Sequence, residues 1–247
     1  MSAPLRIRYR FDLPDGSRKT LDLLFDAASF RLSNAPPADP PFWTELNFNQ
    51  CANCPLSAER QTHCPAAVQM AAALEPLKAL VSFDTVGVTV VESERTVYAQ
   101  TTAQQAMSSV LGLIMATAGC PWTDRLRPMA RFHLPFANEA ETLYRSVSMF
   151  LLARALAGQS APAAEPAPGE KEMRAVPAGA GFAALEDLYK NLHVVNRDMS
   201  RRLGAATNTD PARNAIALLD TYTTLLPAAL ERSLDELKPL FDAWQSS

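Results

Sequence analysis

The distribution of four cysteines is the feature that most constrains how this chain can fold. Cys51 and Cys54 form a Cys-x-x-Cys pair, Cys64 follows soon after, and Cys120 lies much further along. The last three each precede a proline. Two thiolates at this spacing can reach one metal ion or cluster, and a distant fourth ligand would tie a loop to the body of the domain. The pattern therefore predicts that all four cysteines converge on one site.

Composition limits the classes of protein to consider. The chain has 247 residues, of which 48% are hydrophobic and 20% charged, so it can bury a sizeable core. A net charge of -3 disfavours a general nucleic-acid binder. The N-terminus lacks the apolar region of a signal peptide, and no apolar stretch is long enough to span a bilayer. We therefore expect a cytoplasmic protein with no nucleic-acid or membrane partner, in which four cysteines indicate a metal site or free thiols rather than two disulfides.

Period-two alternation of apolar and polar side chains predicts two β-hairpins, over residues 5–25 and 85–100. The first strand carries Arg6, Arg8 and Arg10 on one face. These arginines could form an anion-binding stripe. We interpret them instead as the solvated face of an outer sheet, because charge on a wet strand face needs no ligand.

Helix signals follow each late cysteine. Proline suits the first position of a helix, so helices are predicted to begin after Cys64 and after Cys120, with a buried helix over residues 102–118 between them. At helix starts, amide donors and the helix dipole would favour thiolates. Asn138 and Glu141 have the spacing of a capping box that opens a further helix.

These elements predict an α+β fold, with two β-hairpins and several helices packed around a cysteine-ligated site. Residues 1–158 would form that domain. Residues 159–180 are rich in Pro and Ala and predict a linker. Residues 181–247 carry an apolar stripe at helical spacing and predict a helical hairpin or small bundle. This C-terminal part would pack on the main domain, self-associate or bind a protein partner.

Two runs resemble an uncharacterised bacterial family, a domain of unknown function. They are Arg-Phe-His-Leu-Pro-Phe-Ala at residues 131–137 and Glu-Thr-Leu-Tyr-Arg-Ser-Val-Ser-Met-Phe-Leu-Leu at residues 141–152. The Cys-x-x-Cys-Pro region is also similar, so the resemblance covers roughly residues 5 to 157. It implies neither an activity nor any functional residue.

Two further groups of residues are candidates for the site. The segment after Cys120 contains a basic cluster that could hold an anion or neutralise a negatively charged cluster: Arg125, Arg127, Arg131 and His133. We favour surface arginines and a satisfied core histidine, because no partner acid or nucleophile lies at fixed spacing. His63 adjoins Cys64 and could replace one thiolate, but four cysteines already complete a four-coordinate site.

The favoured function is therefore a non-catalytic metalloprotein. It would bind an iron–sulfur cluster, with [4Fe–4S] preferred, through Cys51, Cys54, Cys64 and Cys120, in a redox-sensing, electron-transfer or accessory role. A structural zinc site of the same four cysteines, in a protein-interaction scaffold, is the first alternative. A thiol redox enzyme using Cys51 and Cys54 is the second. A scaffold whose cysteines are simply buried small hydrophobes is the third.

Overall fold

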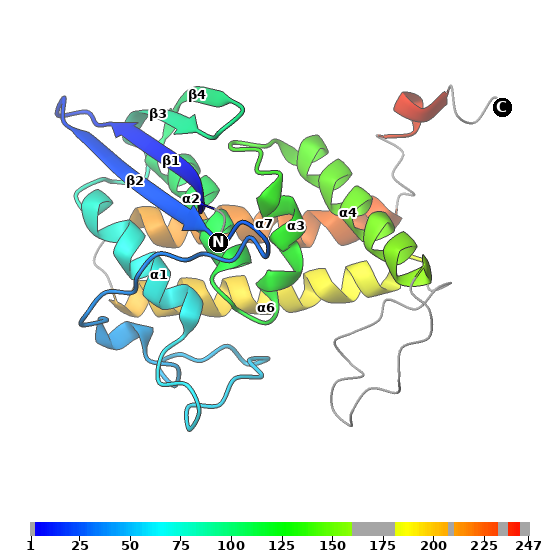
Figure 1. Cartoon of the computed structure of the whole chain (residues 1–247), viewed down its shortest axis with the longest axis horizontal. Coiled ribbons are helices and arrows are strands. Elements are labelled where there is room, and N and C mark those ends of the chain that lie inside the picture. The colour runs from blue at the N-terminus through cyan, green and yellow to red at the C-terminus, as the bar shows by residue number, and fades with distance from the viewer. Residues whose placement is uncertain (1–2, 160–180, 207–209, 232–236, 243–247) are drawn as a thin grey trace. The chain divides into compact units, whose positions relative to one another are not determined.

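The computed structural model describes residues 3–159, 181–206, 210–231 and 237–242, which form an α+β fold (Figure 1). The linker predicted at residues 159–180 lies outside these described residues, apart from Gln159 at the end of a helix. No helix in the described ranges is long and apolar enough to cross a membrane.

Both predicted hairpins form, and they join in one antiparallel sheet. The first consists of β1 (Leu5–Asp12) and β2 (Arg18–Phe25), and the second of β3 (Thr85–Val91) and β4 (Thr96–Thr102). The strand order is β2-β1-β3-β4, because β1 pairs with β3 as well as with β2. Pairing of the two innermost strands therefore places residues from the start of the chain beside residues some eighty positions later.

One face of the sheet packs into the hydrophobic core. The alternate residues Ile7, Tyr9 and Phe11 of β1 are buried, as the period-two pattern predicts. They belong to the same apolar cluster as α2 (Ala103–Thr117), whose residues Leu111 and Ile114 are fully buried. The sheet and α2 thus form the main hydrophobic core.

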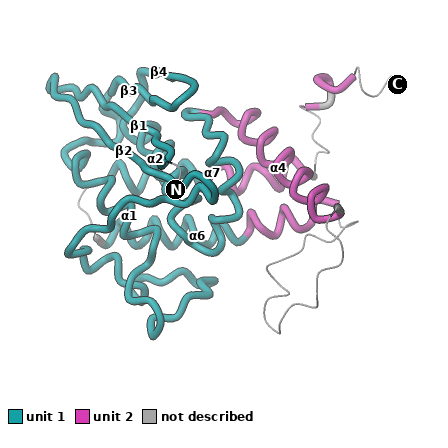
Figure 2. Tube along the Cα trace, viewed as in Figure 1, with its two compact units in different colours: residues 1–136, 191–221 teal, residues 137–190, 222–247 magenta. Residues whose placement is uncertain are grey.

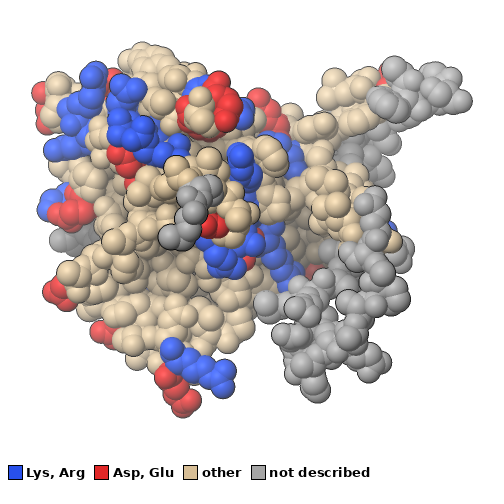
Figure 3. All heavy atoms as spheres, in the orientation of Figure 1, with Lys and Arg blue, Asp and Glu red and all other residues tan. Residues whose placement is uncertain are grey.

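The opposite face of the sheet is charged. Arg8 donates to both carboxylate oxygens of Asp22, at 2.7 and 2.9 Å, and Arg18 donates to Asp12 at 2.6 Å. Figure 3 shows Lys and Arg gathered over β1 and β2. Cross-strand pairs account for Arg8 and Arg18 without a bound anion.

The structure that follows Cys64-Pro65 differs from the structure that follows Cys120-Pro121. Cys64 is the N-cap of α1 (Pro65–Leu74), as predicted, and the 3-10 helix η2 (Glu75–Leu77) follows it. Cys120 instead precedes a turn, and the next helical element is the 3-10 helix η3 (Thr123–Leu126), which runs into the short helix α3 (Arg127–Arg131). The predicted helix start at Cys120 is therefore wrong: Gly119, at a φ of +90°, ends α2 and the chain turns before helical structure resumes.

The chain divides into two compact units that do not follow chain order (Figure 2). Unit 1 comprises residues 1–136 and 191–221, and unit 2 comprises residues 137–190 and 222–247. The long helices α6 (Ala183–Ala206) and α7 (Asp210–Glu231) each contribute to both units. Much of the predicted C-terminal hairpin thus belongs to the unit that holds the sheet. The predicted division into domain, linker and hairpin itself stays a prediction.

Unit 2 is helical. Its helix α4 (Glu139–Gln159) begins with the predicted capping box: Glu141 N donates to Asn138 Oδ1 at 2.9 Å, and Asn138 N donates to Glu141 Oε2 at 2.8 Å. The buried hydroxyls of Ser146 and Tyr189 are 2.5 Å apart and link α4 to the first part of α6. The 3-10 helix η4 (Lys238–Phe241) also belongs to this unit.

Candidate functional site

The Cys-x-x-Cys loop is held by side chains from two other segments of unit 1. The turn closes through Cys54 N, which donates to Cys51 O at 3.0 Å. Between them, Ala52 N donates to the carboxylate of Asp198 on α6 at 2.9 Å. The side-chain nitrogen of Asn53, Nδ2, donates to Asn191 O and Oδ1, also on α6, at 3.1 and 3.0 Å. These bonds fix the loop against one helix.

The segment after Cys120 reaches the same loop. Trp122 Nε1 donates to Asn53 O at 2.7 Å, so the indole lies beside the turn that carries Cys51 and Cys54. Trp122 stands two residues after Cys120 in the sequence. One short hydrogen bond thus brings the distant fourth cysteine into the neighbourhood of the first pair.

Cys64 is fixed by the aromatic arm that precedes the cysteines. Its amide donates to Thr44 O at 2.7 Å, and Leu46 N donates to Thr62 O at 2.8 Å, so the two segments pair over a short stretch. The arm includes the 3-10 helix η1 (Phe42–Thr44). Its buried Trp43 and Leu46 pack this pair of segments onto the protein.

Arg202 of α6 holds the arm from the other side. Its Nη1 donates to Trp43 O and Glu45 O at 2.6 Å each, and its Nη2 donates to Leu46 O at 3.2 Å. The side chain is buried, with 1% of the residue exposed. These carbonyls flank Thr44 O, the acceptor of the Cys64 amide, so Arg202 supports the backbone next to that cysteine.

The three supporting residues of α6 share one helix face. Asn191, Asp198 and Arg202 are seven and four positions apart, which returns a helix to nearly the same side. The carboxylate of Asp198 also accepts from Arg197 at 3.0 Å and from Arg201 at 3.4 Å. Burial alone would raise the pKa of Asp198, but these hydrogen bonds, the Ala52 amide and the two arginine charges lower it below its ordinary value.

Cys51 and Cys64 have raised pKa values. The pKa of Cys51 is raised to about 12, mainly by burial. The charges of Cys64, Cys120, Cys54 and Asp198 contribute the rest of this increase. The pKa of Cys64 is also raised: burial outweighs the hydrogen bonds from the amides of the first turn of α1 and the charge of Arg202. The amides at the start of α1 do favour the Cys64 thiolate, as expected, but burial outweighs their effect.

Cys51, Cys54, Cys64 and Cys120 are all free cysteines. Among the described residues, no three His, Cys, Asp or Glu side chains are arranged as a ready metal site. Hydrogen bonds connect the three cysteine-bearing segments, but a Cys-ligated site stays a prediction.

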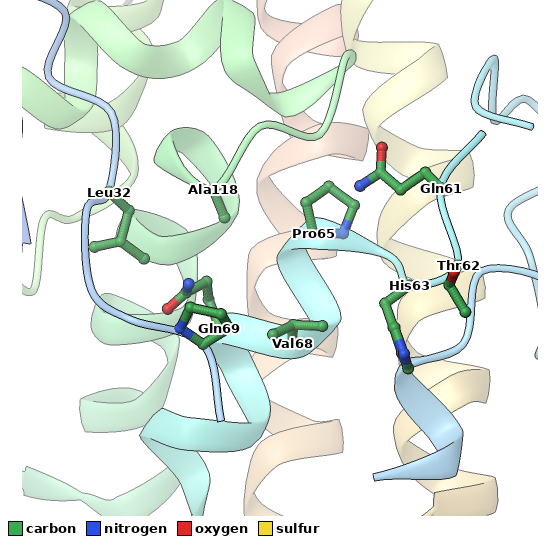
Figure 4. Close-up of a pocket in the computed structure, with 9 residues that line it drawn as sticks. Leu32, Gln61, Thr62, His63, Pro65, Val68, Gln69 and Ala118 are labelled. Atoms are coloured by element: carbon green, nitrogen blue, oxygen red, sulfur yellow. The ribbon is translucent and has the colours of Figure 1, made fainter. Parts of the chain in front are cut away.

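His63 lies at the edge of this region. Its Nδ1 is 2.9 Å from the hydroxyl of Thr44, which leaves Nε2 as the nitrogen that could reach a metal. The same histidine lines a cavity of about 390 Å³. Figure 4 shows the residues that bound it: Gln61, Thr62, His63 and Pro65, then Val68 and Gln69 of α1, and Leu32 and Ala118. His63 and Pro65, the sequence neighbours of Cys64, line the cavity, but none of the four cysteines does.

The basic segment after Cys120 is engaged in structural contacts. Arg125 lies over the Trp122 ring at 5.2 Å, Arg131 lies over Phe30 at 5.5 Å, and Arg127 donates to Asp124 at 3.0 Å. The buried His133 has its Nε2 2.5 Å from the hydroxyl of Tyr9, which also contacts Ser109 at 2.8 Å. These contacts favour the interpretation of surface arginines and a core histidine.

Sequence reasoning missed the residues that organise the site: Asn53, Trp122, Asn191, Asp198 and Arg202. A signal for three of them existed. Polar residues at positions 191, 198 and 202 border the apolar stripe of α6 at steps of seven and four. Such spacing marks a polar line along one helix face, although it does not say what the line contacts.

Residues 7–242 match the family described as a domain of unknown function (DUF6901), so the chain belongs to this family. The match confirms the resemblance found in the sequence and extends it through α6 and α7. It therefore includes the helix that supports the cysteine-bearing segments. Comparison with curated proteins and with solved structures found no match.

Proposed function

We propose that this DUF6901 protein is a non-catalytic metalloprotein in which Cys51, Cys54, Cys64 and Cys120 bind one metal centre. The observation that carries the proposal is the hydrogen-bonded framework around the cysteines. Residues of α6 and Trp122 tie three separate cysteine-bearing segments to one another. A loop with little regular structure of its own gains such support when its geometry serves a ligand.

A [4Fe–4S] cluster is the favoured occupant, in a redox-sensing, electron-transfer or accessory role. The aromatic arm beside Cys64 supports this choice, because apolar side chains that keep water from a cluster tune its reduction potential. Trp43 of this arm is buried and Phe48 is half-buried. Zinc bound by the same four thiolates, as a structural site in an interaction scaffold, is the second candidate.

The raised thiol pKa values argue against a thiol redox enzyme. A nucleophilic cysteine needs a depressed pKa so that the thiolate exists near neutral pH. Cys51 has the opposite shift, since burial and the neighbouring thiols hold its proton. A metal would instead displace these protons on binding, and its charge would stabilise the thiolates.

The test is elemental analysis of protein purified without oxygen. The iron–sulfur proposal expects brown protein with iron and sulfide in equal amounts, whose absorption bleaches with dithionite. Cys120→Ser should lose the colour, whereas Ser57→Ala, an exposed change in the loop between Cys54 and Cys64, should keep it. Colourless protein with stoichiometric zinc would replace iron–sulfur with the zinc scaffold. Protein that takes up neither metal would contradict the metalloprotein proposal.

Self-association or binding of a protein partner through the C-terminal helices is proposed as an accompanying property. Leu240 and Phe241 of η4 are exposed, at 72% and 40%, near the end of the chain. Apolar side chains exposed together favour contact with another protein. Light scattering of the wild type and of Leu240→Ser tests for self-association. If the chain self-associates through η4, the wild type should have a larger molar mass than Leu240→Ser.

A further inference from the structure

Arg202 is a buried cation among neutral acceptors. Its three hydrogen bonds go to main-chain carbonyls, and its Nε has no partner in the described part of the chain. The guanidinium carbon is 5.9 Å from the centre of the Phe48 ring. Carbonyls and an aromatic face partly replace water, but they supply no full negative charge.

The nearest carboxylate on the helix is otherwise engaged. Asp198 lies one turn before Arg202, and its oxygens accept from Arg197, Arg201 and the Ala52 amide. It therefore balances the two exposed arginines and the cysteine loop. A buried arginine without an anion is costly, because the charge has left water without gaining a partner.

The geometry indicates where the missing anion belongs. The carbonyls bound by Arg202 lie on either side of Thr44, whose own carbonyl accepts the amide of Cys64. Arg202 therefore borders the backbone that holds Cys64, one of the four proposed ligands. Four thiolates bring more negative charge than a zinc ion or an oxidised iron–sulfur core brings positive charge, so the filled site is anionic.

We infer that Arg202 is the internal countercharge of this metal centre, a positioning residue that favours an anionic four-thiolate complex over the empty site. This inference rests on the proposed function. When the site is filled, the charge of Arg202 and that of the complex compensate each other in a region of low dielectric constant. Because reduction adds negative charge to an iron–sulfur cluster, Arg202 also stabilises the reduced form and raises the reduction potential.

The experiment measures binding of Co²⁺ to the full-length, metal-free chain under anaerobic reducing conditions, by the thiolate-to-cobalt absorption. Arg202→Gln removes the charge and keeps amide donors, and it should weaken binding about 10- to 100-fold, in the range found for residues that support metal ligands. Arg202→Lys keeps the charge and loses the fork of donors, and it should remain close to the wild type. Arg213→Gln, the same change at an exposed arginine of α7, is the matched control.

Each outcome separates this inference from the proposed function. Wild-type protein that binds neither Co²⁺ nor iron contradicts the metal site itself. Wild-type binding with equal affinity in Arg202→Gln overturns the countercharge alone. If Arg202→Gln does not fold, the test is made with Arg202→Lys, which keeps the positive charge. Folded Arg202→Lys protein that no longer binds Co²⁺ would show that the role of Arg202 is purely structural. In iron-loaded protein, the midpoint potential of Arg202→Gln should be more negative than that of Arg213→Gln, and equal potentials would also overturn the inference.

Discussion

The sheet with α2 and the cysteine-bearing loops are two regions of unit 1 that are stabilised in different ways. The sheet and α2 bury apolar side chains such as Phe11 and Leu111. The loops around Cys51 and Cys64 contain little regular structure and are held by side chains that bind main-chain atoms. The first region depends on the removal of apolar surface from water, whereas the second combines packing against that core with a few specific polar contacts.

This difference explains how the cysteine loops can serve a ligand. A core packed at high density resists rearrangement, whereas a loop fixed by hydrogen bonds can adjust its side chains when a ligand binds. Under the proposed function, the thiols would close on a metal without disturbing the sheet. The two regions should respond separately to mutation, and the predictions below run from the largest expected effect to the smallest.

Leu111→Ala should give the largest loss of stability. Leu111 is fully buried in α2, so its truncation should lower the free energy of unfolding by about 2–5 kcal/mol. Leu151→Ala, at a leucine of α4 that is 47% exposed, is the matched control and should have a much smaller effect. Urea unfolding measures both. Because Leu111 takes no part in the hydrogen bonds that hold the loops, the folded fraction of Leu111→Ala should keep its full metal content, and a proportional loss of metal would break the comparison.

Asp198→Asn should have an intermediate effect that depends on pH. The pKa of Asp198 is lowered in the folded state, so the stability it contributes is present above its ordinary pKa of about 4 and is lost as the pH falls through the folded value. At neutral pH the substitution should cost about 1.5–3 kcal/mol, typical of hydrogen bonds to a charged group. Urea unfolding at a series of pH values should show a shallower acid-side loss than in the wild type. Parallel curves would exclude a role for this carboxylate.

Trp122→Phe should have a smaller effect that is confined to the loops. It keeps an aromatic ring and removes the Nε1 donor to Asn53 O, which should cost about 0.5–1.5 kcal/mol. The link between Cys120 and the Cys-x-x-Cys loop should loosen, so Cys120 should react faster with a thiol reagent in the metal-free protein. Mass spectrometry of the labelled peptides measures this rate, and unchanged labelling would mean that the hydrogen bond does not hold the two segments together.

Asp22→Asn should have the smallest effect. Asp22 accepts two bonds from Arg8 on the exposed face of the sheet, where solvent and salt screen the pair. The denaturation midpoint should shift close to the limit of resolution, and metal content should not change. A large loss of stability would show that polar contacts hold the sheet as they hold the loops.

Local patterns predicted local structure. The alternation around Tyr9 gave the core face of β1, the proline after Cys64 gave the start of α1, and the Asn138–Glu141 spacing gave a cap that forms. Each of these depends on residues within a few positions of one another, where backbone geometry sets the period.

The contacts that organise the site could not be predicted in this way. Arg202 binds Trp43 O across 159 positions and Asp198 binds Ala52 N across 146 positions. These partners are main-chain groups, which carry no mark in the sequence, so no residue pattern identifies them. The cysteine spacing therefore suggested a site, while the residues that support it became evident only in three dimensions.

The most direct test of the metal site is X-ray absorption at the iron and zinc edges of protein purified without oxygen. The account predicts a first shell of sulfur alone, at a metal–sulfur distance of about 2.3 Å for either metal site. In Cys120→Ser protein that retains metal, one protein sulfur should be lost from that shell. A wild-type first shell of oxygen and nitrogen, or protein without bound metal at either edge, would contradict the claim that these four cysteines form one metal centre.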